Sequence, residues 1–127
     1  MSRRSEVIAV AGEALVDLVL ERDGRTTAHL GGGPFNAART LGRLGLRPMF
    51  IARLGRDAYA VALRDELRHS GVRLDGIVTT DDPTTFARVD LDEAGVASYR
   101  FYVDGTASPG LLPHEARAAM RADPVAL

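Results

Sequence analysis

Short apolar runs alternate with helical segments over the first half of the chain, and this alternation constrains the fold more than any other feature. Residues 7–11 are apolar throughout, which is typical of a strand buried on both faces. A second buried strand is expected over 48–54. It lies between a helix over 35–44 and a helix over 57–69 whose cap is Asp57. Strands that alternate with helices indicate an α/β fold built on a parallel sheet.

A second group of strands follows a different pattern. Strands are expected over 15–20, 26–30, 85–91 and 97–103, and the last two alternate polar and apolar residues around a hairpin turn at 92–95. Such alternation indicates one covered face and one wet face. We therefore expect a small separate sheet that stands off the α/β body, followed by a last helix over 113–122.

Composition excludes several kinds of partner. The net charge of -1 gives no reason to expect nucleic acid as a partner. The chain has no cysteine, so disulfides and thiolate metal sites are excluded. His29, His69 and His114 lack metal-ligand spacing and are expected on the surface. No apolar run is long enough to span a membrane, and no signal peptide is recognisable, so we expect a cytoplasmic protein without a metal site.

The most informative stretch is a glycine loop that opens the first helix, Gly31-Gly32-Gly33-Pro34-Phe35-Asn36. Glycines at a helix start expose backbone N–H groups and let a ligand approach closely. Asn36 adds a donor and an acceptor, so the set suits the hydroxyls of a polyol or a phosphate. A structural turn is the simpler interpretation of the loop taken alone. A nucleotide P-loop is excluded, because it needs a lysine and the chain contains none.

The spacing of this stretch resembles the amino-terminal signature of the PfkB, or ribokinase-type, carbohydrate kinases. The matching positions are Gly32, Gly33, Pro34, Asn36, Ala38, Gly45 and Gly55. Residues 12–18 resemble the family's first strand and turn, and residues 84–107 resemble the lid of bacterial fructokinases. The resemblance implies a partial ribokinase-like fold over residues 1–127, with lid strands at approximately 15–30 and 79–105 inserted in the α/β body.

The same resemblance implies roles for individual residues. Asp17 would accept hydrogen bonds from sugar hydroxyls, and Gly32, Gly33 and Asn36 would contact further hydroxyls. Phe101 would cover the sugar. An equally weighted alternative makes Phe101 an aromatic residue of the lid core or of a dimer interface, so a homodimer through the lid is one expected assembly.

Departures from the family pattern leave the sugar open. Val103 stands where relatives acting on acidic keto sugars commonly carry an arginine, and Ser108-Pro109 replaces an Asp-Arg pair of bacterial fructokinases. Fructose is favoured, with 2-keto-3-deoxygluconate, ribose or a nucleoside as alternatives. Arg88 and Arg100 are candidates for the rim of the site, although exposed strand arginines are usually only solvated.

The family's catalytic aspartate belongs to a carboxy-terminal Gly-Ala-Gly-Asp motif, which does not occur in these 127 residues. The resemblance implies that a full-length protein uses ATP and Mg²⁺ to phosphorylate a sugar hydroxyl. The present chain is then expected to hold the sugar-binding half only, with no catalytic residue and no cofactor of its own. Alternatives are a non-catalytic sugar-binding or dimerisation fragment, and an unstable half-domain with an open sheet edge.

Overall fold

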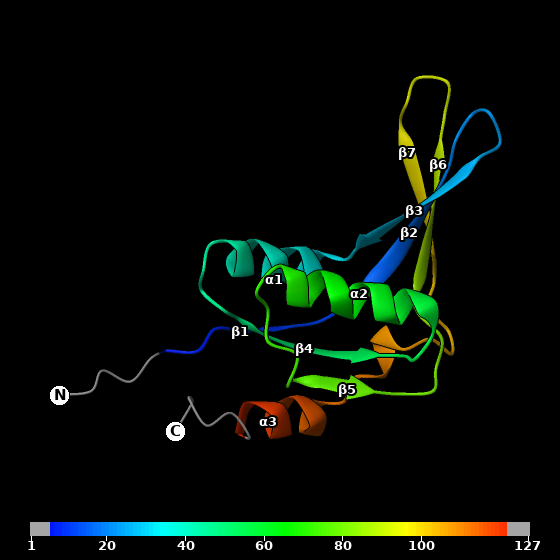
Figure 1. Ribbon diagram of the computed structural model, residues 1–127. Helices are drawn as coiled ribbons and strands as arrows, with labels where there is room; N and C mark the ends of the chain where they lie inside the picture. The colour runs from blue at the N-terminus through cyan, green and yellow to red at the C-terminus, as the bar shows by residue number, and fades with distance from the viewer. Residues whose placement is uncertain (1–5, 122–127) are drawn as a thin grey trace.

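The computed structural model describes residues 6–121, which form two sheets (Figure 1). The body sheet is parallel, with the order β1 (Ala9–Ala11), β4 (Met49–Leu54) and β5 (Ile77–Thr79). The projecting sheet stands away from the body and has the order β3 (Thr26–Gly31), β2 (Leu15–Leu20), β6 (Phe86–Leu91) and β7 (Ala97–Tyr102). In the projecting sheet β2 pairs antiparallel with β3 and parallel with β6, and β6 pairs antiparallel with β7.

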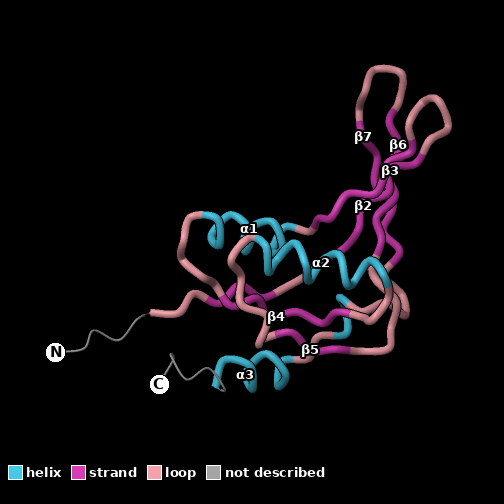
Figure 2. The backbone as a smooth tube through the Cα atoms, viewed as in Figure 1, coloured by secondary structure: helices cyan, strands magenta, loops and turns pink. Residues whose placement is uncertain are grey.

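Helices cover both faces of the body sheet (Figure 2). The helices α1 (Gly33–Arg43) and α2 (Ala58–His69) lie on one face, and α3 (Pro113–Arg121) lies on the other. A short 3₁₀ helix, η1 (Ser108–Gly110), precedes α3. None of these helices, within residues 6–121, is long and apolar enough to cross a bilayer.

The hydrophobic core lies between the body sheet and the helices α1 and α2. The rings of Phe35 from α1 and Phe50 from β4 meet edge to face at 6.4 Å, and both are fully buried. Arg53, on the other face of β4, forms an ion pair of 3.0 Å with Glu115 of α3. No residue of α3 is fully buried, and this ion pair links the helix to β4 of the body.

The predicted α/β class, with a parallel sheet and a small projecting sheet, is confirmed. Most predicted elements agree with the structure to within two residues. The final residue of the last predicted helix, Ala122, lies outside the described residues. The short strand β5 is not anticipated by the sequence pattern, and since Thr79 pairs with Leu54 in the body sheet, the second segment of the projecting sheet begins only at β6.

Two burial expectations are wrong. β1 is not buried on both faces, because Ala9 and Ala11 are exposed and only Val10 packs against the core. β7 has no covered face either, since all six of its residues are exposed. An apolar or alternating run predicts a strand, but whether each face is covered depends on tertiary neighbours that the run itself does not specify.

Asp57 links α2 to the segment that enters the projecting sheet. Its carboxylate accepts a hydrogen bond from the Ala60 amide at 2.9 Å, which confirms the predicted helix cap. The same carboxylate accepts from the Thr84 amide at 2.8 Å and from the Thr84 hydroxyl at 2.6 Å. Burial opposes ionisation of Asp57, but these hydrogen bonds outweigh it and lower the pKa of the carboxyl.

Further hydrogen bonds hold the segments that enter and leave the projecting sheet. The hydroxyls of Thr85 and Thr106 lie 2.8 Å apart, and the Ser108 amide donates to the Thr85 hydroxyl at 3.1 Å. The Ser108 hydroxyl donates to the Ala14 carbonyl at 2.7 Å. The base of the projecting sheet is therefore fixed to the body by short polar side chains, together with apolar contacts of Leu30 with the core and of Phe86 with Tyr59 on α2.

We predict that Asp57→Ala lowers the free energy of unfolding by about 2–3 kcal/mol at pH 7, since it removes a helix cap and two further hydrogen bonds. A carboxyl whose pKa is depressed in the folded state stabilises the fold at pH values above its unfolded-state pKa. This stabilisation is lost as the pH falls through the folded-state pKa. The difference from wild type, measured by urea denaturation, should narrow below about pH 4.

Asp65→Ala is the matched control for this substitution. Asp65 also lies on α2 but pairs with Arg68 on the surface, where both side chains are about two-thirds exposed. Its replacement should change the free energy of unfolding by less than about 0.5 kcal/mol. Equal effects of the two substitutions would contradict the role assigned to Asp57.

Candidate functional site

Cross-strand register places four residues in one row across the projecting sheet. Asp17 on β2 lies opposite His29 on β3 and level with Ala87 on β6, which in turn lies opposite Phe101 on β7. Residues paired in this way point to the same face of a sheet. We call these four residues the Asp17 row.

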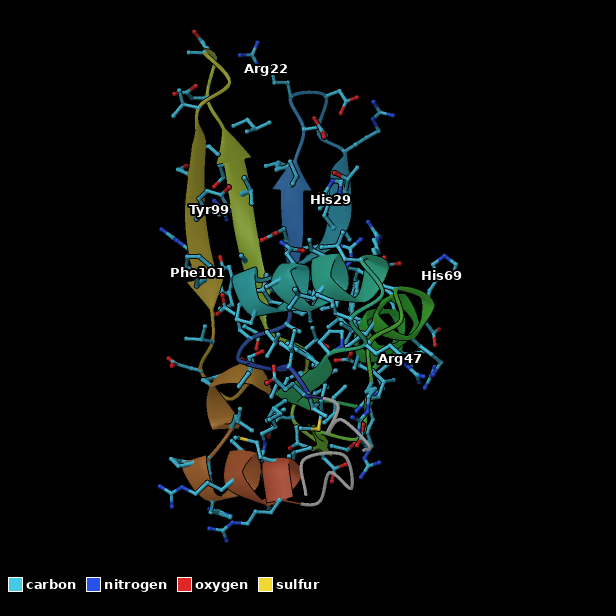
Figure 3. The ribbon with its side chains drawn as sticks, turned by 90° about the vertical axis from the view of Figure 1, so that its left-hand side faces the viewer. Arg22, His29, Arg47, His69, Tyr99 and Phe101 are labelled. Atoms are coloured by element: carbon cyan, nitrogen blue, oxygen red, sulfur yellow. The ribbon has the colours of Figure 1, made fainter. Side chains whose placement is uncertain are left out.

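The row has a carboxylate and an aromatic ring separated by a small residue. Neighbouring strands lie about 4.8 Å apart, so the backbones at Asp17 and Phe101 are about 10 Å apart. Ala87, between them, is fully buried. Phe101 is 58% exposed, and its ring stacks on that of Tyr99 at 6.2 Å. Figure 3 shows Tyr99 and Phe101 on one outer strand of the sheet and His29 on the other.

Asp17 adjoins the glycine loop through Gly31, the last residue of β3. A Cβ atom at Gly31 would lie 2.6 Å from the Asp17 Oδ2 atom, so the absence of a side chain there makes room for the carboxylate. Burial raises the pKa of Asp17, and the nearby His29 partly offsets that rise. Gly31 was not among the predicted site residues, although its place in a run of three glycines was a visible signal.

The next two glycines differ in how much space a side chain would find at each position. Gly32 has a φ of 107°, and a Cβ atom there would lie 2.8 Å from the Glu13 carbonyl oxygen, so only glycine is accommodated without strain. A Cβ atom at Gly33 would meet no atom within 4 Å. The space beside Gly33 is therefore open at the point where α1 begins.

The start of α1 places polar groups beside this open space. Its N-cap, Gly32, provides no side-chain cap, and the first turn contains no acidic residue. Asn36 lies in that turn and is exposed, and its Oδ1 atom makes only a long contact of 3.5 Å with Arg39. Backbone N–H groups and an amide side chain are thus available to a ligand that both donates and accepts hydrogen bonds.

The structure brings some of the predicted residues together and separates others. Asp17 lies at the glycine loop, whereas Phe101 shares its face of the sheet but is two strands away. Arg88 and Arg100 point to the opposite face by register, so they do not rim the Asp17 row. Arg88 instead pairs with Asp90 at 2.8 Å.

The three histidines were predicted to lie on the surface. His29, His69 and His114 are exposed. Among residues 6–121, no group of three or more histidine, cysteine or acidic residues could hold a metal ion.

Comparison with known proteins decides the family. A family model described as pfkB family carbohydrate kinase matches residues 5–119. The chain belongs to the pfkB family of carbohydrate kinases. Its glycine loop and Asp17 therefore lie within a region that the family model covers, and the resemblance seen in the sequence is confirmed.

Relatives of this pfkB chain include several fructokinases. It is 35% identical to a fructokinase of Escherichia coli over 100 residues, which cover 78% of the chain and 33% of the relative. It is 38% identical to a fructokinase of Rhizobium leguminosarum bv. trifolii over 108 residues, which cover 80% of the chain and 32% of the relative. The chain thus spans about a third of the length of these curated relatives.

Solved structures give the same result at the level of the fold. The crystal structure of a fructokinase from Xylella fastidiosa with bound ATP matches with a TM-score of 0.79 and 30% identity. That match covers 87% of this chain and 37% of the other. A second structure of a fructokinase from the same organism matches with a TM-score of 0.76 and 34% identity, over 86% of this chain and 37% of the other.

Alanine substitutions along the glycine loop should have graded effects on thermodynamic stability. Gly32→Ala should lower the free energy of unfolding by about 2–3 kcal/mol, because a side chain there meets backbone at a positive φ. Gly31→Ala should cost about 1 kcal/mol, because the Asp17 carboxylate can move aside. Gly33→Ala should be neutral or stabilise by about 0.5 kcal/mol, since an alanine meets nothing there and reduces the entropy of the unfolded chain. Chemical denaturation measures all three, and a different order would contradict the loop geometry.

Proposed function

We propose that this chain forms the sugar-binding half of an ATP-dependent sugar kinase of the fructokinase type. The observation that carries the proposal is the Asp17 carboxylate, which lies beside the open glycine loop and shares a face with Phe101. The proposed sugar-binding residues are Asp17, Gly32, Gly33, Asn36 and Phe101. The fructokinase names of the relatives favour fructose over 2-keto-3-deoxygluconate, ribose or a nucleoside.

The chemistry of the site suits a polyol. An ionised Asp17 can only accept hydrogen bonds, so it selects hydroxyl groups that donate. The loop N–H groups and Asn36 supply the donors and the further acceptor that the remaining hydroxyls need. Phe101 offers an apolar surface to the carbon skeleton of the sugar.

We further propose that the projecting sheet acts as a lid inserted in the body. Its base is held by the polar contacts of Asp57, Thr85 and Ser108. Its Asp17 face carries two of the proposed sugar-binding groups, Asp17 and Phe101. A sheet that covers the sugar would exclude water, which otherwise competes with the sugar hydroxyl for the transferred phosphoryl group. We place this reaction in the cytoplasm.

The sequence lacks two features that would indicate a site for ATP. It contains no lysine for a P-loop, and it contains no Gly-Ala-Gly-Asp motif. We therefore assign no phosphoryl-transfer step to these residues, and place ATP, Mg²⁺ and the catalytic base in a longer protein of which this chain is a part. A coupled kinase assay of that protein with the four classes of sugar tests this proposal, and no turnover of any would contradict it.

Calorimetry with fructose tests the sugar site on the chain itself. Asp17→Asn should weaken fructose binding about tenfold or more, because the amide loses charge-assisted hydrogen bonds. Asp90→Asn is the matched control, since Asp90 is a carboxylate on the other face of the same sheet. ATP should give no binding heat. Equal losses in the two variants, or binding of ATP by the 127-residue chain, would contradict the proposal.

A dimerisation unit is the second candidate function. It is favoured by β7, where all six residues are exposed, including Tyr99 at 60% and Phe101 at 58%. Large aromatic groups in contact with water on one strand are typical of a surface that another protein covers. In this alternative a second copy of the chain packs against the projecting sheet, and Phe101 belongs to the interface.

Phe101→Ala separates the two candidate roles of this side chain. If Phe101 covers the sugar, as we expect, the substitution should weaken fructose binding about fivefold without changing the sedimentation coefficient. Tyr102→Ala is the control, because Tyr102 is an exposed aromatic residue on the other face of β7. A change in sedimentation with unchanged fructose affinity would instead assign Phe101 to a dimer interface.

A further inference from the structure

Arg39 lies one turn after Asn36 on α1, and its guanidinium is held by two neighbours. Its Nη2 and Nε atoms donate to the Oε1 atom of Glu66 on α2 at 2.8 and 3.1 Å. The guanidinium carbon also lies 5.3 Å from the centroid of the Phe35 ring, which is fully buried in the core. These contacts fix the guanidinium relative to α1 and leave its Nη1 atom for another partner.

The Nη1 atom reaches a side chain of the proposed sugar site. It donates to the Asn36 Oδ1 atom at 3.5 Å, which is longer than a typical hydrogen bond. A guanidinium has donors and no acceptor, so the amide must turn its oxygen, rather than its NH2 group, toward Arg39. The NH2 group then points away from Arg39, and because Asn36 is exposed, a ligand can reach it.

The geometry of α1 places Asn36 between Arg39 and the glycine loop. Residues three apart are neighbours on a helix surface, so Gly33, Asn36 and Arg39 follow one another along one face of α1. Side chains on a helix lean toward its amino end. Asn36 therefore leans toward the open space beside Gly33, and Arg39 approaches Asn36 from the side opposite the loop.

Glu66 anchors this arrangement from the neighbouring helix. Its Oε1 atom also accepts hydrogen bonds from Arg43 at 2.8 Å and from the Ser70 hydroxyl at 3.4 Å. Burial opposes ionisation of Glu66, but the hydrogen bonds and charges of Arg39 and Arg43 outweigh it and lower the pKa of the carboxyl. Because this carboxylate balances its charge, Arg39 can influence a neutral sugar chiefly through Asn36.

We propose that Arg39 is a positioning residue for Asn36, and that it holds the amide with its NH2 group toward the sugar. This inference rests on the proposed sugar site. It goes beyond that site by choosing between the two roles that the amide could take there. A sugar hydroxyl that meets Asn36 accepts a hydrogen bond, whereas a hydroxyl that meets the Asp17 carboxylate donates one.

The contact can be measured without any sugar. Arg39→Met keeps an unbranched apolar side chain beside Phe35 but removes every donor. The Asn36 NH2 group should then become more mobile in ¹⁵N relaxation measurements, because nothing holds the amide oxygen. Arg43→Met is the matched control, since it removes the other arginine bound to Glu66 and should leave Asn36 unchanged. Equal mobility of this NH2 group in wild type and Arg39→Met would overturn the proposal.

Fructose affinity reads out the functional part of the proposal. Arg39→Met should bind fructose about threefold more weakly than wild type, and Arg43→Met should match wild type. In an Asn36→Ala background, Arg39→Met should cause no further loss, because Arg39 acts through Asn36. A loss of the same size with and without the Asn36 side chain would show a merely structural role and overturn the proposal.

Arg39→Lys serves if Arg39→Met does not fold. A lysine can keep an ion pair with Glu66, but its single ammonium lacks the planar fork that reaches Glu66 and Asn36 together. It should show the same mobile amide and the same loss, and wild-type affinity for fructose in Arg39→Lys would overturn the proposal. If wild type binds no fructose, the sugar site fails and this inference fails with it, whereas the NMR measurement still reports separately whether Arg39 holds Asn36.

Discussion

The position of β2 between β3 and β6 is the constraint on which the rest of the site depends. β2 pairs with one strand that follows it in the chain and with another that lies far away in sequence, and both pairings fix Asp17 at the same level as its neighbours. Because side chains alternate between faces, a slip of one residue would turn Asp17 toward the face of Arg88 and Arg100. The register thus decides whether the carboxylate shares a face of the sheet with an aromatic ring or with a pair of guanidinium groups.

The glycine loop depends on the same constraint. β3 ends at Gly31, so its pairing with β2 brings the loop to Asp17 and leads it into α1. Close approach of Gly32 to the Glu13 carbonyl fixes the path of the loop, and Asp57 and Ser108 fix the base of the projecting sheet to the body. Sheet pairing, loop path and polar anchoring therefore act together to place donors and acceptors around one open space.

Much of the fold was predictable from the sequence, and the reasons are local. Strand and helix periodicity gave the bounds of β2, β6 and α2 closely, and Asp57 was recognisable as a cap. β5 has only three residues, too few for a period to be seen. The exposure of β1 and β7 depends on neighbours rather than on their own residues.

The candidate site was predictable only in part, because strand pairing depends on two segments of the sequence rather than on one. The loop and Asp17 followed from a motif, whereas the shared face of Asp17 and Phe101 required the β2–β6 register. The cross-strand pairing of His29 with Asp17 could have been predicted more easily. A hairpin loop over residues 21–25 sets Leu20 opposite Thr26, and counting back along both strands brings the two residues together. His29 was correctly predicted to be exposed.

The most direct test of a sugar site on the Asp17 face is to map fructose onto the ¹H–¹⁵N NMR spectrum of the chain. We predict chemical-shift changes at the amides of Asp17, Ala87 and the Gly31–Gly33 loop, and at the side-chain amide of Asn36, with little change at Arg88, Asp90 or Arg100. Chemical-shift changes confined to the Arg88 face of the sheet, or to α2 and α3, would contradict a sugar site on the Asp17 face.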